Sequence, residues 1–213
     1  MKKTLTIIAL LLIGITSFAQ KDPAAKKVLD ATASKISSMK NIKAQFEISQ
    51  FRGATPNGET MRGTILLSGK KYKVDAPGVT TTWFDGKTQW VYVHDNEEVN
   101  VSNPTKQEQA TMNPYAFIGI YKKGYNYTLK EAKVNGVDTY EVRLTAENAG
   151  AEIPEAIINI DKNNMPLSVR VRQGKQTWTR IRISNMQGKQ KFSVDTFTFP
   201  RNEYTDAELI DLR

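Results

Sequence analysis

The side chains that could carry out chemistry are few in this sequence. It contains no Cys and a single His, which excludes disulfides, thiolate zinc sites and cysteine nucleophiles. The one histidine, His94, stands beside Asp95, but no Gly-x-Ser-x-Gly sequence provides the serine that a Ser-His-Asp triad would need. A single histidine also leaves too few ligands for a histidine-rich metal site. We therefore interpret His94 as a surface residue at a strand end and expect no metal and no cofactor.

Two further motifs resemble catalytic ones but lack their partners. Ser37–Lys40 has the Ser-x-x-Lys spacing of penicillin-binding enzymes, whereas the Ser-Asp-Asn and Lys-Thr-Gly sequences that accompany it in those enzymes are absent. The carboxylate pairs Glu97/Glu98 and Glu152/Glu155 lie in polar segments that are typical of solvated turns. The sequence thus predicts no catalytic residues and a protein that is not an enzyme.

The first residues have the pattern of a secretory signal peptide. The basic Met1–Lys3 precedes the largely apolar run Thr4–Ile15, and Ser17–Ala19 supplies small residues where a signal peptidase cleaves. The apolar run is shorter than the roughly 20 residues that a membrane-spanning helix needs, and no Cys follows it that could be lipidated. We predict that residues 1–19 are removed and that residues 20–213 form a single exported domain.

The chain is basic, with 30 Lys and Arg against 22 Asp and Glu and a formal net charge of +8. Nucleic acid is a usual partner of basic chains, but the predicted export signal argues against it. Anionic lipid head groups or acidic protein surfaces suit an exported basic protein better. The nearest approach to a basic cluster comprises Arg170, Arg172, Lys175, Arg180 and Arg182, which we interpret as a solvated strand face.

The elements that must position any site begin with a helix. Asp22 followed by Pro23 is typical of a helix start, and apolar residues recur at helical spacing as far as Met39. From Ile42 the apolar period changes to two, which indicates strands, and turn dipeptides such as Asn135-Gly136 separate them. We expect about eleven antiparallel strands. The twelve candidate segments are Ile42–Ile48, Thr60–Leu67, Lys71–Ala76, Thr80–Phe84, Thr88–Val93, Val99–Val101, Tyr125–Lys133, Val137–Thr145, Ala156–Asp161, Leu167–Arg172, Thr177–Asn185 and Val194–Phe199.

The segment Thr105–Tyr121 interrupts this alternation. It contains a set of apolar residues around a proline, which indicates one or two short helices, Gln107–Met112 and Tyr115–Tyr121. An apolar helical segment inserted between strands usually lies across one face of the sheet, so we predict a central helical lid. The lid residues are Met112, Pro114, Phe117, Ile118 and Tyr121.

About eleven antiparallel strands in one domain favour a strongly curved sheet or barrel. A closed barrel filled by its own side chains has no room for two apolar helices. We therefore predict a mainly β fold with helices (α+β): an unclosed antiparallel β-barrel, with the helices enclosing an apolar cavity that binds an apolar ligand. The predicted cavity residues are Phe46, Ile48, Ile65, Leu67, Trp90, Tyr92, Val142, Leu144 and Val169.

The stretch Thr82–Tyr92, with its Asp-Gly-Lys turn before an aromatic-x-Tyr strand, resembles the periplasmic outer-membrane lipoprotein carriers, the LolA-like family. Ile42–Phe46 resembles the first strand of that family, and Arg62–Leu67 resembles its second. Asn113–Ile118 lies where the family has a proline-containing central helix. The similarity covers essentially the whole chain after residue 19.

The resemblance implies an unclosed β-barrel with a helical lid. It also implies a monomeric chaperone that shields the acyl chains of lipoproteins and carries them across the periplasm from the inner to the outer membrane. The implied partners are acylated lipoproteins, an inner-membrane lipoprotein-releasing transporter and an outer-membrane acceptor. Two alternatives remain: a periplasmic sensor or regulatory binding domain of the same fold that acts through a protein partner, and a hydrolase that uses His94.

Overall fold

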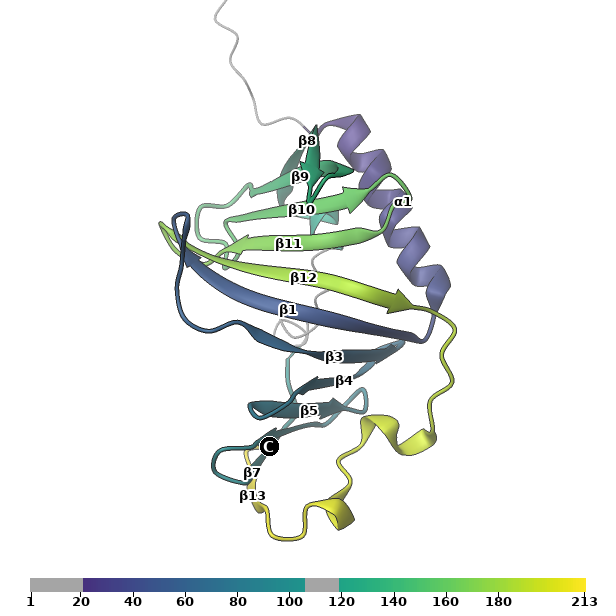
Figure 1. The fold of residues 1–213 in the computed structure, drawn as a ribbon, viewed down its shortest axis with the longest axis vertical. Coiled ribbons are helices and arrows are strands. Elements are labelled where there is room, and N and C mark those ends of the chain that lie inside the picture. The colour runs from purple at the N-terminus through teal and green to yellow at the C-terminus, as the bar shows by residue number, and fades with distance from the viewer. Residues whose placement is uncertain (1–20, 106–118) are drawn as a thin grey trace, which may run out of the picture.

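The computed structural model describes residues 21–105 and 119–213, and in this part the chain forms a single α-helix and a curved sheet of thirteen strands (Figure 1). The elements are α1 (Pro23–Met39), β1 (Ile42–Arg52), β2 (Thr55–Pro56), β3 (Met61–Ser68), β4 (Lys71–Ala76), β5 (Thr80–Phe84), β6 (Gln89–Val93), β7 (Glu98–Ser102), η2 (Ile120–Lys122), β8 (Tyr125–Val134), β9 (Val137–Ala146), β10 (Glu155–Asp161), β11 (Pro166–Arg172), β12 (Thr177–Gln187), η3 (Val194–Phe197), η4 (Arg201–Glu203) and β13 (Glu208–Asp211). The predicted signal peptide, residues 1–19, lies outside the described residues.

The helix begins and packs as its sequence predicts. The Asp22 carboxylate accepts hydrogen bonds from the backbone N–H groups of Ala24 at 2.8 Å and Ala25 at 3.4 Å, which satisfies donors that a helix start leaves free. Ala25 and Leu29 are fully buried against the sheet. The helix ends at Lys40, whose φ of 56° turns the chain toward β1.

The strands follow the order β13-β7-β6-β5-β4-β3-β1-β12-β11-β10-β9-β8, with β2 paired to β1. All pairs are antiparallel except β13 with β7. β13 and β8 form the two edges of this path, so the sheet is unclosed. The curved, unclosed, mainly β architecture is therefore confirmed. β12 inserts between β1 and β11 and joins the first strands of the chain to the later ones (Figure 1).

The predicted strand count is close but differs in the short elements. β2 and β13 were not expected, and the expected strand Val194–Phe199 is wrong. Its first residues form the 3-10 turn η3, in which the N–H of Thr196 bonds to Ser193 and that of Thr198 to Asp195. Val194 is 88% exposed whereas Phe197 is buried, so the alternation in the sequence does not correspond to a half-buried strand.

The predicted lid is not seen as a helical layer. Met112, Pro114, Phe117 and Ile118 lie outside the described residues, and so does the first predicted lid helix. Of the second, the described part contains the 3-10 turn η2, which includes Tyr121. Within residues 21–105 and 119–213, no helix is both long and apolar enough to cross a bilayer.

The sheet buries apolar side chains on both of its faces, in different places. We call the face that packs against α1 the inner face and the opposite one the outer face. The inner cluster lies under α1 and extends from β8 to β5, including Leu29, Val142 and Phe84. The outer cluster consists of Trp83, Val99, Val101, Phe199 and Ala207, with Trp90, Tyr92 and Tyr204 packed against it.

Candidate functional site

Most of the predicted cavity residues come together on the inner face. They belong to the inner cluster and come from four strands: Phe46 and Ile48 on β1, Ile65 and Leu67 on β3, Val142 and Leu144 on β9, and Val169 on β11. Strand pairing connects them because directly paired residues point to the same face of a sheet. The structure therefore brings these side chains together on one face of the sheet, as the alternation in the sequence predicts.

One row of paired residues shows how continuous the apolar surface is. Val142 on β9 pairs with Ile158 on β10, which pairs with Val169 on β11. Val169 pairs with Ile181 on β12, which in turn pairs with Ile48 on β1. The row crosses five strands with branched aliphatic side chains only. Such side chains offer no hydrogen bonds, so this surface suits an apolar ligand or an apolar cover.

Gly63 on β3 shapes the inner face beside this row. It pairs with Phe46, and a Cβ atom at Gly63 would lie 2.0 Å from the backbone O of Asp75 and 2.6 Å from Cζ of Phe46. Glycine is thus required because the Phe46 ring lies against the backbone here. No role was predicted for Gly63, although a glycine inside an alternating strand signals a close approach.

A groove opens where the C-terminal end of α1 meets the β3–β4 hairpin. Its volume is about 370 Å³, within the range of roughly 300–1,000 Å³ typical of ligand pockets. It is lined by Ile36, Ser37, Lys40, Asn41, Ile42, Leu67 and Gly69. Asn41 is fixed at its edge because it accepts from Ser68 Oγ at 2.8 Å and donates to the Gln190 carbonyl at 2.9 Å. The groove therefore opens onto the part of the inner face at Ile42 and Leu67, whereas Val142, Ile158 and Val169 of the aliphatic row are completely buried.

Trp90 and Tyr92 do not lie on the inner face with the other predicted cavity residues. Trp90 pairs with Trp83, and both point to the outer face. The Tyr92 ring centroid lies 4.6 Å from that of Tyr204, and the Trp83 centroid lies 5.4 Å from that of Phe199. The physical reason is that the chain after β12, residues 188–213, packs on the outer face at β5–β7. We call these residues the C-terminal segment.

The sequence contained a signal for this cover on the outer face. Trp83 and Phe84 are adjacent on β5, so they point to opposite faces, and both are almost completely buried. Two successive aromatic residues in a short strand indicate burial on both faces. The partner that covers Trp83 could have been sought among the aromatic residues near the C-terminus, such as Phe199 and Tyr204.

The chain after residue 118 is fastened to α1 through Tyr121. Its hydroxyl donates to Asp30 Oδ1 at 2.5 Å, and Lys26 Nζ lies 2.6 Å from Asp30 Oδ2. Hydrogen bonds from Lys26 and Tyr121 hold the pKa of Asp30 below its usual range, while burial and Asp30 raise the pKa of Tyr121. The Tyr121 ring is buried and meets Tyr127 on β8 edge to face. Of the predicted lid residues, Tyr121 is thus anchored between helix and sheet.

The inner face becomes polar toward β6. The Tyr72 hydroxyl donates to Gln89 Oε1 at 2.6 Å in a buried position, and the Tyr72 ring stacks on Phe84 with 4.9 Å between centroids. Burial raises the pKa of Tyr72 to about 12, so the phenol is neutral at physiological pH. The apolar surface therefore ends at a satisfied polar pair, which was not predicted from the sequence.

His94 is not placed to activate the neighbouring Thr81 as a general base would. Its Nε2 lies 3.0 Å from Thr81 Oγ1, and the Thr81 hydroxyl donates to Asp75 Oδ1 at 3.0 Å. Because the Thr81 proton goes to Asp75, the ring nitrogen of His94 acts as the donor, opposite to what activation of a nucleophile requires. Within the described part of the chain, no cluster of His, Asp and Glu could hold a metal ion.

The sequence model of one family, described as outer membrane lipoprotein carrier protein LolA, matches residues 15–175. The chain belongs to the LolA family. The match ends before β12 and the C-terminal segment, so the central strand β12 and the cover of the outer cluster lie beyond it. No curated protein sequence matches the chain.

Solved structures share the LolA-type fold at low sequence identity. An uncharacterized conserved protein from Thermus thermophilus superposes with a TM-score of 0.57 at 12% identity, over 88% of this chain and 99% of that one. LprF from Mycobacterium bovis gives 0.51 at 11% identity, over 85% and 99% of the two chains. The Mycobacterium tuberculosis lipoprotein LppX gives 0.50 at 12% identity, over 82% and 100%. At this identity the similarity concerns the fold.

Proposed function

We propose that this LolA-family protein is a periplasmic chaperone that holds the acyl chains of lipoproteins against its inner face and carries them from the inner to the outer membrane. Its partners would be acylated lipoproteins, an inner-membrane transporter that releases them and an outer-membrane acceptor. The observation that carries the proposal is the unbroken aliphatic row on the inner face, from Val142 to Ile48, in a chain that belongs to the lipoprotein carrier family.

Binding would be non-covalent and would need no catalytic group. Each methylene removed from water stabilises the complex by about 0.8 kcal/mol, so an acyl chain gains affinity from length alone. The groove beside Ile36 and Leu67 provides an entrance at the C-terminal end of α1. Lys40 and Asn41 at its rim suit the polar end of such a ligand, while the apolar tail would extend under the helix.

The test is binding of a synthetic diacylated lipopeptide with a fluorescent label, compared with the same peptide without acyl chains. We expect saturable binding of the acylated peptide alone. Ile36→Asp, which places a charge in the groove, should weaken binding at least about tenfold. Ser34→Asp is the matched control because it adds the same charge to an exposed position of the same helix.

Equal binding of both peptides, or equal losses in the two variants, would contradict the carrier role. The periplasmic regulatory alternative predicts a protein partner instead. Gentle purification from the periplasm that recovers a membrane-anchored regulator, with no acylated lipoprotein, would favour that alternative.

A further inference from the structure

The outer face of the sheet carries an excess of positive charge that its own carboxylates do not balance. Three glutamates there are each shared by two cations: Glu47 by Arg62 and Arg182, Glu141 by Lys130 and Arg170, and Glu155 by Arg143 and Arg172. Partial burial raises the pKa of Glu47 and of Glu141. The two cations beside each carboxyl outweigh burial and hold its pKa below the usual value. Each triad therefore retains a positive charge.

Arg180 adds a further cation at the centre of this surface. It lies on β12, where it pairs with Arg170 on β11 and Ser49 on β1, so no carboxylate faces it in the sheet. Among the described residues it forms no ion pair, and its Nε is buried without a hydrogen-bond partner. Burial, together with Arg182 and Arg170, lowers the pKa of Arg180, yet a guanidinium remains charged at physiological pH.

A pocket of about 230 Å³ lies beside this guanidinium. Its lining residues are Phe51, Gly53, Ala54, Ile157, Arg170, Trp178 and Arg180. Strand pairing divides them into two rows: Phe51 pairs with Trp178, and Arg170 pairs with both Ile157 and Arg180. The Arg180 guanidinium also lies over the Phe51 ring, 4.5 Å from its centroid. The pocket thus has an aromatic row next to a cationic row.

We propose that this pocket binds the phosphate of an anionic phospholipid head group and so holds the outer face of the protein against a membrane surface. A phosphate has enough oxygens to accept from both Arg170 and Arg180, and guanidinium groups match its geometry. The glycerol part of the head group packs on Phe51 and Trp178. Tryptophan and arginine together are typical of the membrane–water interface.

A membrane lipid fits better than a soluble phosphate ester for two reasons. The net charge, +8 for the full sequence and +6 without Lys2 and Lys3 of the predicted signal peptide, attracts the whole protein to an anionic bilayer. The pocket also lies at the end of β1 and the start of β12, where the exposed residues Arg52, Gly53 and Lys175 flank it. Because the pocket is on the outer face, docking leaves the inner face free, and the proposal does not depend on the ligand held there.

The test is co-sedimentation of the protein with vesicles of phosphatidylcholine alone or mixed with phosphatidylglycerol. We expect binding to the mixed vesicles, weakened about tenfold by Arg180→Gln, the size expected for a lost charge-assisted hydrogen bond of about 1.5 kcal/mol. Lys175→Gln is the matched control because it removes the same charge from an exposed position nearby. Arg180→Lys should also weaken binding, since it keeps the charge but loses the planar fork.

Folding can be checked independently in the same variants. Arg180→Gln removes a cation that has no carboxylate partner but also removes its contact with the Phe51 ring, so its urea unfolding midpoint should stay near that of the wild type. An equal loss of vesicle binding in Arg180→Gln and Lys175→Gln would overturn the proposal, because general charge attraction would then explain the binding. Saturable calorimetric binding of glycerol phosphate without any vesicle binding would overturn the membrane assignment and point to a soluble phosphate ester.

Discussion

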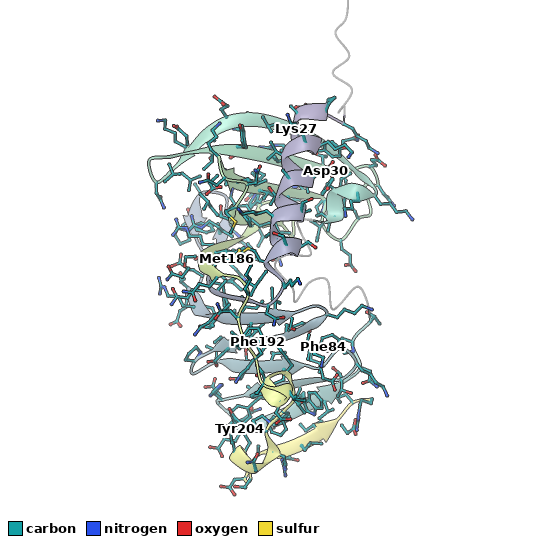
Figure 2. All side chains as sticks on the ribbon, turned by 90° about the vertical axis from the view of Figure 1, so that its right-hand side faces the viewer. Lys27, Asp30, Phe84, Met186, Phe192 and Tyr204 are labelled. Carbon is teal, nitrogen blue, oxygen red and sulfur yellow. The ribbon has the colours of Figure 1, made fainter. Side chains whose placement is uncertain are left out.

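The two apolar clusters of this protein differ in composition, cover and fit. The inner cluster is mostly aliphatic, spans most of the sheet and is covered by α1. The outer cluster is small and largely aromatic, and the chain's own C-terminal segment covers it. In Figure 2, α1 crosses the upper part of the molecule, whereas the C-terminal segment, in yellow, runs down the lower part past Phe192 to Tyr204.

This difference separates a binding surface from a structural one. In the outer cluster, Tyr204 meets the rings of Trp83, Tyr92 and Phe199 with centroids 4.6 to 5.6 Å apart. The Tyr204 ring meets Trp83 and Tyr92 edge to face and Phe199 at a tilt. Such ring packing has a specific geometry, which leaves little freedom for a ligand. The aliphatic row of the inner face has no such ring contacts, which on that face join Tyr72 to Phe84 and Tyr121 to Tyr127, and the face is open at the groove beside Ile36. We infer that the outer cluster stabilises the fold while the inner face serves binding.

The largest expected effect comes from breaking the outer cluster. Trp83 is 1% exposed, and Trp83→Ala should lower the free energy of unfolding by about 3–5 kcal/mol because it leaves a large cavity. Urea denaturation measures this loss. Lipopeptide affinity, measured where the variant is folded, should stay near the wild-type value. A loss below about 1 kcal/mol would mean that the C-terminal segment adds little to stability; Val194→Ala, at an 88% exposed position, is the control.

A smaller effect is expected at the anchor between Tyr121 and Asp30. A double-mutant cycle with Tyr121→Phe and Asp30→Asn should give a coupling of about 1 kcal/mol at neutral pH, below the roughly 1.5–3 kcal/mol of a hydrogen bond to a charged group because the Asp30 side chain is 48% exposed. The pKa of Asp30 is lower in the folded protein than in the unfolded chain. Its contribution to the free energy of unfolding is therefore fully present at a pH above the pKa of the unfolded chain. The coupling should decline below about pH 4 and vanish once the pH is under the lowered native pKa. A coupling that stays constant from neutral pH down to about pH 2 would show that the ionised carboxylate is not the acceptor.

The smallest expected effect is on lipopeptide affinity when a residue of the outer cluster is replaced. Trp90 belongs to the outer cluster, so Trp90→Asp should destabilise the protein yet leave the affinity of the folded protein for lipopeptide within about twofold of wild type. Fluorescence titration of the labelled lipopeptide measures this affinity. Binding lost to the same extent as in Ile36→Asp would assign the outer cluster to the ligand site.

Much of the fold could be predicted from the sequence, because alternation and turn dipeptides report which side chains share a face. The helix start at Asp22 and the placement of Phe46 and Val142 followed from local pattern alone. The pairing of β12 between β1 and β11 could not be predicted in this way. Phe46 on β1 pairs with Ile183 on β12, far along the chain, and local pattern contains no signal for such a distant register.

The site was predicted in part for the same reason. Alternation identifies a face within one strand, but it does not say which face of one strand continues into which face of the next. Local pattern therefore did not show that Trp90 and Tyr92 lie on the other face from the remaining predicted cavity residues. Nor could local pattern show that Arg180 is paired with Arg170 and Ser49 and with no carboxylate, since that depends on the pairing of β11, β12 and β1. The basic cluster interpreted as a solvated face contains a pocket.

The most direct test of the central claim is photocrosslinking with a diacylated lipopeptide that carries a diazirine near the end of one acyl chain. Mass spectrometry of the digested product then locates the acyl chain on the protein. We predict crosslinks on α1 and the inner face, at residues such as Ile36, Met39 and Leu67. Crosslinks concentrated at Trp90, Tyr92 or Tyr204, or an equal yield with an unacylated diazirine peptide, would contradict binding at the inner face.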